Sequence, residues 1–278
     1  RYTSLTAFNA RYRQGRITAT GSLVYTNVTE HVKIGDVPAD FQRLAPSFTV
    51  SLQPWQEQLL FLRLMYKSTF RMPTFNDLYY YRLGNRSLRP EKANEYNMGI
   101  TWSRSFSSFL NYLSVTVDGY YNDVTDKIVA FPTTYAWKMA NYGKVHVTGM
   151  DATLAAAASL GKNMVLVVSG GYTWQKAIDL TDATSKSYKD QLPYTPKHSG
   201  NVSAVLEMPW VNVGYSIVGV SERYSMSQNI PENRIDGYME HTVSLSRNFS
   251  FRHCKLRLQA EIINLTDTQY DAVSYTHL

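Results

Sequence analysis

The sequence predicts an all-β protein, an antiparallel transmembrane β-barrel to which this chain contributes about 12 strands. Three observations support this fold class. Apolar and polar residues alternate along a series of segments, short and long connections alternate between those segments, and aromatic residues gather near the segment ends. A strand repeats every second residue, so it has two unlike faces, and in a membrane barrel one face meets lipid while the other meets water.

The alternation of apolar and polar residues is clearest in three segments. Residues 60–67 carry leucines and a tyrosine on one face, with Arg63 and Lys67 on the other. Residues 113–122 and 256–263 alternate in the same way. The same alternation extends over residues 201–208 and 211–217, which are joined by a tight turn at Pro209-Trp210, and it is weaker over residues 150–160 and 164–175. Each segment is therefore expected to form a strand of about 10–14 residues with one lipid-facing side.

The connections alternate strictly between two lengths, as in outer-membrane barrels that pair short turns at one end with long loops at the other. The short breaks fall near residues 14–16, 53–57, 104–109, 160–163, 208–211 and 247–254. The long polar stretches fall near residues 28–43, 68–93, 123–140, 176–198 and 223–236. A soluble β-sandwich, the adhesin-like alternative, has no reason to separate loop lengths by end.

Aromatic residues are placed where such strands would meet the membrane interface. The chain has 21 Tyr, 11 Phe and 5 Trp, and a tyrosine ring tolerates apolar surroundings while its hydroxyl meets water. The residues that we expect near strand ends are Trp55, Tyr66, Tyr121, Tyr172, Trp174, Trp210 and Tyr224. Ordinary enrichment of aromatic residues in strands is the competing explanation.

Composition excludes several other classes of protein. Mean hydropathy is −0.30, and no segment approaches the roughly 18 consecutive apolar residues of a membrane-spanning helix. Cys254 is the single cysteine, so no internal disulfide can form. The formal net charge of +6 is spread along the chain, which favours a hydrated barrel interior and loops over nucleic-acid binding. Nucleophile-elbow, Walker and dinucleotide motifs are absent, so we predict that the chain is not an enzyme.

Three consecutive motifs connect the chain with a known family. Residues 70–80 read FRMPTFNDLYY, residues 84–91 read GNRSLRPE, and residues 95–99 read EYNMG. In this order and spacing they resemble the long extracellular loop, and the strand after it, of TonB-dependent outer-membrane receptors. Later landmarks of that family are matched by DKI at 126–128, NYG at 141–143, GMD at 149–151 and NLTDTQY at 264–270. The resemblance covers about residues 44–270.

The resemblance implies a 22-stranded barrel closed by an N-terminal plug domain. Nothing in this chain resembles the plug, the early strands or the final strand. We therefore expect residues 1–278 to form one partial barrel domain, about the second half of the barrel, with two unpaired sheet edges that would leave it inactive alone.

The resemblance also implies a function in the outer membrane of a Gram-negative bacterium. Receptors of this family import scarce solutes, so the expected ligand is a ferric siderophore, another iron complex or cobalamin. The expected partners are TonB with ExbB/ExbD, acting through the plug, together with outer-membrane lipid and lipopolysaccharide, and no nucleic acid. The alternatives are a passive porin, another outer-membrane barrel such as an enzyme, or a TonB-dependent oligosaccharide importer.

Candidate ligand-contacting residues lie in the long loops, since no catalytic residue, cofactor-binding residue or metal ligand is expected. Aromatic rings and arginines suit planar or anionic ligands. In the loop at 68–93 the candidates are Arg71, Tyr79, Tyr80, Tyr81, Arg82 and Arg86. On other loops they are Tyr135, Trp137, Tyr188, Tyr224 and Arg234. The alternative for Arg71, Pro73 and Tyr79, which belong to the family pattern, is that they order the loop.

Histidines and carboxylates give weaker signals. No histidine lies between Pro73 and Leu88, where haem receptors of the family carry one, and the six histidines are dispersed without metal-ligand spacing. No cofactor is expected; the one candidate is a loop calcium held by Asn122, Asp123 and Asp126, whose oxygens are suitable ligands.

Overall fold

The computed structural model describes residues 1–31, 37, 40–81, 83–132, 137–161, 163–252 and 254–271, without the side chains of residues 131, 132, 137 and 142. In this part of the chain the main element is a single antiparallel sheet of 12 strands, which confirms the predicted fold class. Its strands are β1 (Tyr2–Gln14), β2 (Ile17–Thr29), β3 (Phe41–Leu52), β4 (Leu59–Arg71), β5 (Glu91–Ser105), β6 (Leu110–Pro132), β7 (Trp137–Gly161), β8 (Met164–Asp179), β9 (His198–Glu207), β10 (Asn212–Val220), β13 (Tyr238–Ser250) and β14 (Lys255–Ile262).

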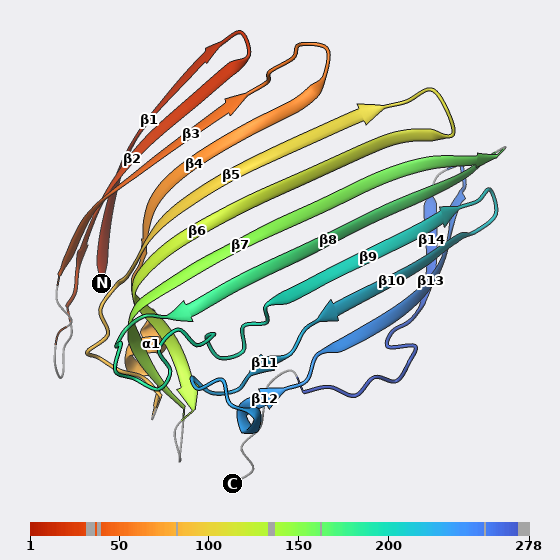
Figure 1. Ribbon diagram of the computed structural model, residues 1–278. Helices are drawn as coiled ribbons and strands as arrows, with labels where there is room; N and C mark the ends of the chain where they lie inside the picture. Colours follow the sequence, from red (N-terminus) through yellow and green to blue (C-terminus); the bar gives the residue numbers. More distant parts are fainter. Residues whose placement is uncertain are drawn as a thin grey trace.

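The strands are neighbours in the sheet in the order in which they follow one another in the chain. Figure 1 shows a sheet curved like part of a barrel wall, with β1 and β14 as separate edges. The sheet is therefore open, as expected for part of a larger barrel. Among the described residues, no helix has the length and apolar character needed to cross a membrane.

The two ends of the sheet differ as the connection lengths predict. Short turns join the strands at one end, including residues 208–211, where the Met208 amide donates to the Val211 carbonyl at 3.2 Å. At the other end, lowest in Figure 1, lie α1 (Phe75–Tyr79), the small strands β11 (Arg223–Tyr224) and β12 (Arg234–Ile235), and the 3-10 turn η1 (Pro231–Asn233). This is the long-loop end.

The prediction of a long loop at 123–140 is wrong, because β6 continues to Pro132 and β7 begins at Trp137. The two strands stay paired from Lys127 opposite Tyr142 to Pro132 opposite Trp137. Asp126 interrupts the alternation with a positive φ of 55°, which explains why the sequence there resembles a loop. These strands are 23 and 25 residues long, longer than the predicted strands, and form a hairpin that extends into the long-loop end.

The two faces of the sheet have the predicted contrast. On one face the Arg63 guanidinium lies 2.9 Å from the Asp118 carboxylate, and Asp151 accepts a hydrogen bond from the Thr173 hydroxyl at 2.6 Å. On the other face Leu64 is opposite Met98, and both are more than half exposed. We assign the first face to the polar interior of the barrel and the second to lipid.

The buried core lies at the long-loop end. A single β-sheet cannot bury side chains by itself, so burial occurs where the loops fold over the sheet. One cluster joins Val124, Val145, Ala177 and Leu192, and a second joins Leu78, Leu88 and Ile128. The second cluster packs α1 and the residues after it against β6.

Candidate functional site

The loop between β4 and β5, which we call the α1 loop (residues 72–90), begins with a well-capped short helix. The Thr74 hydroxyl accepts from the Asp77 amide at 3.1 Å, and the Asp77 carboxylate accepts from the Thr74 amide at 2.9 Å. This reciprocal capping box satisfies amides that a helix start leaves without partners. The cap sets the direction of α1, so that Leu78 points into the cluster with Leu88 and Ile128.

A network of hydrogen bonds joins the two strand ends that flank the α1 loop, Arg71 of β4 and Glu91 of β5, to β6. Arg71 donates to the Ile128 carbonyl at 3.0 Å and to Glu91 at 3.3 Å, while Glu91 accepts from the Ile128 amide at 3.0 Å. Arg71 also lies 3.4 Å from Asp77, and Lys127 lies 3.7 Å from Glu91. The Arg71 side chain is 45% exposed, so its ion pairs are individually weak. The bonds to the β6 backbone give the network its geometry.

The second half of the α1 loop is joined to β7 by two asparagines. Asn85 donates to the Met139 carbonyl at 3.0 Å, and the Met139 amide donates to the Leu83 carbonyl at 3.0 Å. Asn141 accepts from the Arg89 amide at 2.9 Å and donates to the Arg89 carbonyl at 3.0 Å. These side-chain hydrogen bonds satisfy backbone groups that have no strand partner, because the second half of the loop has no regular structure.

Gly84 is required for the tight path of this segment. A Cβ atom there would lie 2.7 Å from the Tyr80 nitrogen and 2.8 Å from the Leu78 carbonyl carbon and oxygen. These are backbone atoms, which cannot move aside as a flexible side chain can. The GN pair of the second motif therefore has two structural roles, close approach by Gly84 and a bond to β7 by Asn85.

The outer surface of the α1 loop has a different character. Phe75, Tyr80 and Tyr81 are 58%, 59% and 79% exposed. The Arg86 guanidinium lies over the Tyr79 ring, 5.3 Å from its centroid, and makes no ion pair within the described part of the chain. An exposed group of rings beside a cation without a carboxylate partner can stack on a planar ligand and attract an anionic one.

The predicted site residues therefore fall into separate groups. Tyr79, Tyr80, Tyr81 and Arg86 come together on the α1 loop, with Tyr79 beside the buried cluster, whereas Arg71, predicted as a loop residue, is the last residue of β4 and lies inside the network. Arg82 and Tyr135 lie outside the described residues. For Trp137 only the backbone position, at the start of β7, is described.

The remaining candidates lie on a second group of loops, residues 180–197 and 221–237. Tyr188 has the Lys189 ammonium 5.3 Å from its ring centroid, and Arg234 lies 3.1 Å from Asp236. The Tyr224 carbonyl accepts from the Tyr194 amide at 2.7 Å, which joins the two loops. In the same group the Thr184 hydroxyl, followed by its backbone amide, holds the pKa of Asp182 below its usual value.

The carboxylates proposed for a loop calcium face cationic partners. Asp126 accepts from Arg89 at 2.7 Å, and Asp123 lies 3.9 Å from the Lys144 ammonium. No group of three or more metal-ligating side chains occurs in the described ranges. The calcium site stays a prediction.

Sequence reasoning did not assign a role to Glu91, Asn85 or Asn141, although each lies in a motif that it singled out. Membership of a motif was the available signal, since Glu91 begins β5, Asn85 lies within the α1 loop and Asn141 lies within β7. Their long-range hydrogen-bond partners, 15 to 54 positions away in the chain, are visible only in the folded structure.

Comparisons with known proteins agree with this architecture. A family model described as TonB dependent receptor-like, beta-barrel, matches residues 3–265. The vitamin B12 transporter BtuB of Photobacterium profundum is 26% identical over 211 residues, 73% of this chain and 31% of the transporter. The copper transporter OprC superposes with a TM-score of 0.73 at 14% identity, over 97% of this chain and 42% of that one.

A second solved structure, the ferric citrate transporter FecA in its unliganded form, superposes with a TM-score of 0.74 at 15% identity. The match covers 96% of this chain and 40% of that one. At such low identity the two structures show a shared fold alone. This chain spans less than half the length of each of the three proteins.

Proposed function

Since the chain belongs to the family of TonB-dependent receptor-like β-barrels, we propose that it supplies part of the wall and the ligand-capturing loops of an outer-membrane receptor. The whole receptor imports a scarce solute, either a ferric siderophore or other iron complex, or cobalamin. Support for these solutes comes from the vitamin B12 transporter relative and from the ferric citrate transporter with the same fold. No covalent chemistry is needed for this function.

The observation that carries the proposal is the two-sided α1 loop. Its underside is bonded to β7 through Asn85, and Arg71 and Glu91 at the flanking strand ends bond to β6, with Arg71 also contacting Asp77 of the loop. Its outer surface presents Tyr80 and Tyr81. A surface that is ordered before the ligand arrives loses little conformational entropy on binding. We assign an ordering role to Arg71 and Tyr79, and ligand contact to Tyr80, Tyr81 and Arg86.

The interior face of the wall supports passage of a hydrated solute. Arg63, Asp118, Asp151, Tyr120 and Gln175 line it with charged and hydrogen-bonding groups. In the whole receptor a plug domain fills this space and takes energy from TonB with ExbB/ExbD. Outer-membrane lipid and lipopolysaccharide surround the other face.

The test is solute binding and uptake by the whole receptor in the outer membrane. The probes are a ferric catecholate, ferric citrate, cyanocobalamin and a linear oligosaccharide, each measured with and without functional TonB. We expect saturable, TonB-dependent uptake of an iron complex or of cyanocobalamin. Uptake of the oligosaccharide alone would point to the oligosaccharide importer, and TonB-independent, unsaturable entry of small solutes would point to a passive porin.

A further inference from the structure

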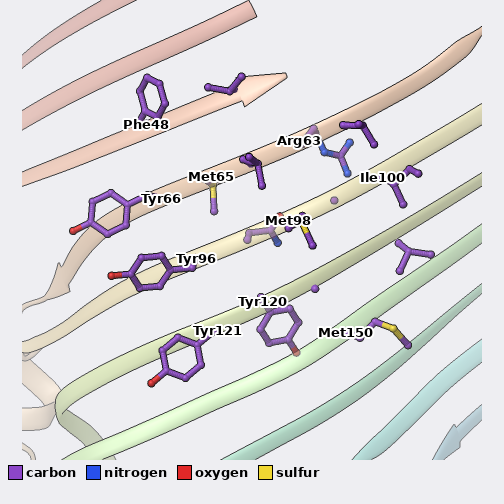
Figure 2. A pocket seen from close by; sticks show the side chains of 17 residues that line it. Phe48, Arg63, Met65, Tyr66, Tyr96, Met98, Ile100, Tyr120, Tyr121 and Met150 are labelled. Carbon is purple, nitrogen blue, oxygen red and sulfur yellow. The ribbon is translucent and has the colours of Figure 1, made fainter. Parts of the chain in front are cut away.

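A groove of about 1090 Å3 crosses the lipid-facing side of the sheet between β3 and β7. Figure 2 shows Phe48, Met98, Ile100 and Met150 around it, with the rings of Tyr66, Tyr96 and Tyr121 along one side. The groove lies outside the barrel interior, because its exposed apolar members alternate along the strands with the interior residues Arg63 and Asp118.

The strand register arranges the side chains of this face in successive rows, from the groove toward the long loops. The first row is apolar and contains Leu64, Met98, Gly119 and Met150. The next row toward the long loops contains Tyr66, Tyr96, Tyr121 and Thr148, followed by Asn94, Asp123 and His146, and then by Lys92, Thr125 and Lys144. Polarity thus rises in steps from apolar to aromatic to hydrogen-bonding to cationic.

The polar rows are connected to one another. The Tyr121 hydroxyl lies 3.2 Å from His146 Nδ1, and His146 Nε2 lies 3.2 Å from Asp123. Asp123 is also 3.9 Å from the Lys144 ammonium. Because Lys92 and Lys144 outnumber the single carboxylate of Asp123, the band above the aromatic row carries net positive charge.

Gly119 leaves space in the groove, although no neighbouring atom would clash with a side chain at this position. A Cβ atom added there would meet nothing closer than the Met98 carbonyl oxygen at 4.0 Å. The interior glycine beside it is different, since a Cβ at Gly99 would lie 2.0 Å from Asp118. A side chain at position 119 would therefore fill the groove without disturbing the strand.

The rows match the depth profile of one membrane leaflet. From Gly119 to Thr125 the strand rises about 20 Å at ~3.4 Å per residue. With a tilt of about 40°, this corresponds to about 15 Å of depth, half of a hydrocarbon core of about 30 Å. The aromatic row corresponds to the interfacial girdle of an outer-membrane barrel, and the cationic row follows it toward the long loops, which assigns that row to head-group level.

We propose that this surface is a specific binding site for lipopolysaccharide. One of its acyl chains occupies the groove over Gly119, and one of its phosphates binds at Lys92 and Lys144. Charge complementarity selects a phosphorylated lipid, and the position beside the long loops selects the outer leaflet. This inference rests on the proposed outer-membrane location, but it does not depend on which solute the receptor carries.

The first test fills the groove. Native mass spectrometry of the whole receptor in mild detergent, with purified lipopolysaccharide as the probe, compares Gly119→Phe with Gly21→Phe. Gly21 faces lipid on β2 opposite Ala10 and Phe48, and a Cβ there meets nothing within 4 Å. We expect Gly119→Phe to weaken lipid binding about tenfold, the effect of displacing roughly two methylenes, and Gly21→Phe to bind as the unmodified receptor does.

Equal binding by Gly119→Phe and the unmodified receptor, or an equal loss in Gly21→Phe, overturns the proposal. Heat-dependent migration on gels establishes that each variant has a folded barrel. If Gly119→Phe does not fold, Gly119→Ala replaces it, for which we expect a smaller loss.

The second test removes the cations. We expect the double variant Lys92→Ala, Lys144→Ala to lose the preference for lipopolysaccharide over its dephosphorylated form. A preference that persists overturns the phosphate assignment, and equal binding of a phospholipid overturns the choice of lipid. Solute binding measured on the same samples separates the two proposals, because a receptor can hold this lipid while binding none of the tested solutes.

Discussion

The underside and the outer surface of the α1 loop differ in what their residues contact. On the underside, Leu78, Leu88 and Asn85 are packed or bonded to β6 and β7, and Glu91, which begins β5 directly after the loop, bonds to β6. On the outer surface, Tyr80 and Tyr81 are largely exposed. The underside is made mostly of the residues that the family motifs specify. The residues that define a family motif can thus hold a loop in place, while neighbouring residues that the motif does not specify form its exposed surface.

The largest expected effect comes from the buried cluster beneath α1. Leu78 is 2% exposed, and its replacement by alanine removes burial and leaves a cavity, a cost of about 2–5 kcal/mol. We expect Leu78→Ala to increase amide hydrogen exchange in residues 83–89, 128–132 and 137–139 of the whole receptor. Leu160→Ala, at a 52% exposed position near the short-turn end, is the matched control. Unchanged exchange in Leu78→Ala would mean that the cluster does not hold the loop.

A smaller effect is expected from the network around Glu91. Glu91→Ala leaves the Ile128 amide without its side-chain acceptor and removes the carboxylate from Arg71 and Lys127. We expect a loss of about 1–2 kcal/mol in local stability, discounted because Arg71 is partly exposed. Hydrogen exchange at Ile128 measures it. Glu222→Ala, which removes an exposed partner of Arg234, should leave that amide unchanged, and equal effects of both variants would reject the network.

Changes on the outer surface should weaken solute binding without destabilising the loop. We expect Tyr80→Ala combined with Tyr81→Ala to weaken binding of the transported solute about tenfold through lost stacking, with hydrogen exchange of the α1 loop unchanged. Titration of the whole receptor with its solute measures the affinity. The paired control, Tyr80→Phe with Tyr81→Phe, retains both rings and should retain most of the affinity. An affinity unaffected by loss of the rings would exclude them from the site.

Arg86 gives a finer test of the same surface. Lysine retains the charge but lacks the planar group that stacks on Tyr79 and forms paired hydrogen bonds. We expect Arg86→Lys to weaken binding about threefold and Arg86→Ala to weaken it further. If both variants bind as tightly as the unmodified receptor, Arg86 has only a structural contact with Tyr79.

The smallest effect concerns pH and the second group of loops. Hydrogen bonds from Thr184 depress the pKa of Asp182, so the ionised carboxylate stabilises its turn at every pH above the unfolded pKa of about 3.9. That stabilisation is lost only as the pH falls through the lower folded pKa. We therefore expect exchange at the Thr184 amide, corrected for its intrinsic rate, to be constant from about pH 8 to about pH 5. A change within that range would point to a different titrating group.

Much of this organisation could be predicted from the sequence, for identifiable physical reasons. Period-two alternation in residues 60–67 assigned Arg63 and Leu64 to opposite faces, since neighbouring residues of a strand always point to opposite sides. Connection lengths predicted which end of the sheet carries the loops. The extension of β6 and β7 beyond Asp126 was not predicted, because one residue at positive φ breaks the two-residue period on which strand prediction depends.

The site could be predicted only in part. Motif spacing identified the α1 loop and its aromatic residues. It left open whether Arg71 and Tyr79 contact ligand or order the loop, since that depends on Ile128 and Met139, far along the chain. The groove over Gly119 was not predicted, because it arises from the alignment of five strands.

The most direct test measures solute affinity and α1-loop hydrogen exchange together in two variants of the whole receptor, Glu91→Ala and the pair Tyr80→Ala, Tyr81→Ala. We predict that Glu91→Ala raises exchange and weakens binding, whereas the tyrosine pair weakens binding and leaves exchange unchanged. If Glu91→Ala raises exchange without weakening binding, or if the tyrosine pair raises exchange as strongly as Glu91→Ala does, the division between a fixed underside and a ligand-binding outer surface is contradicted.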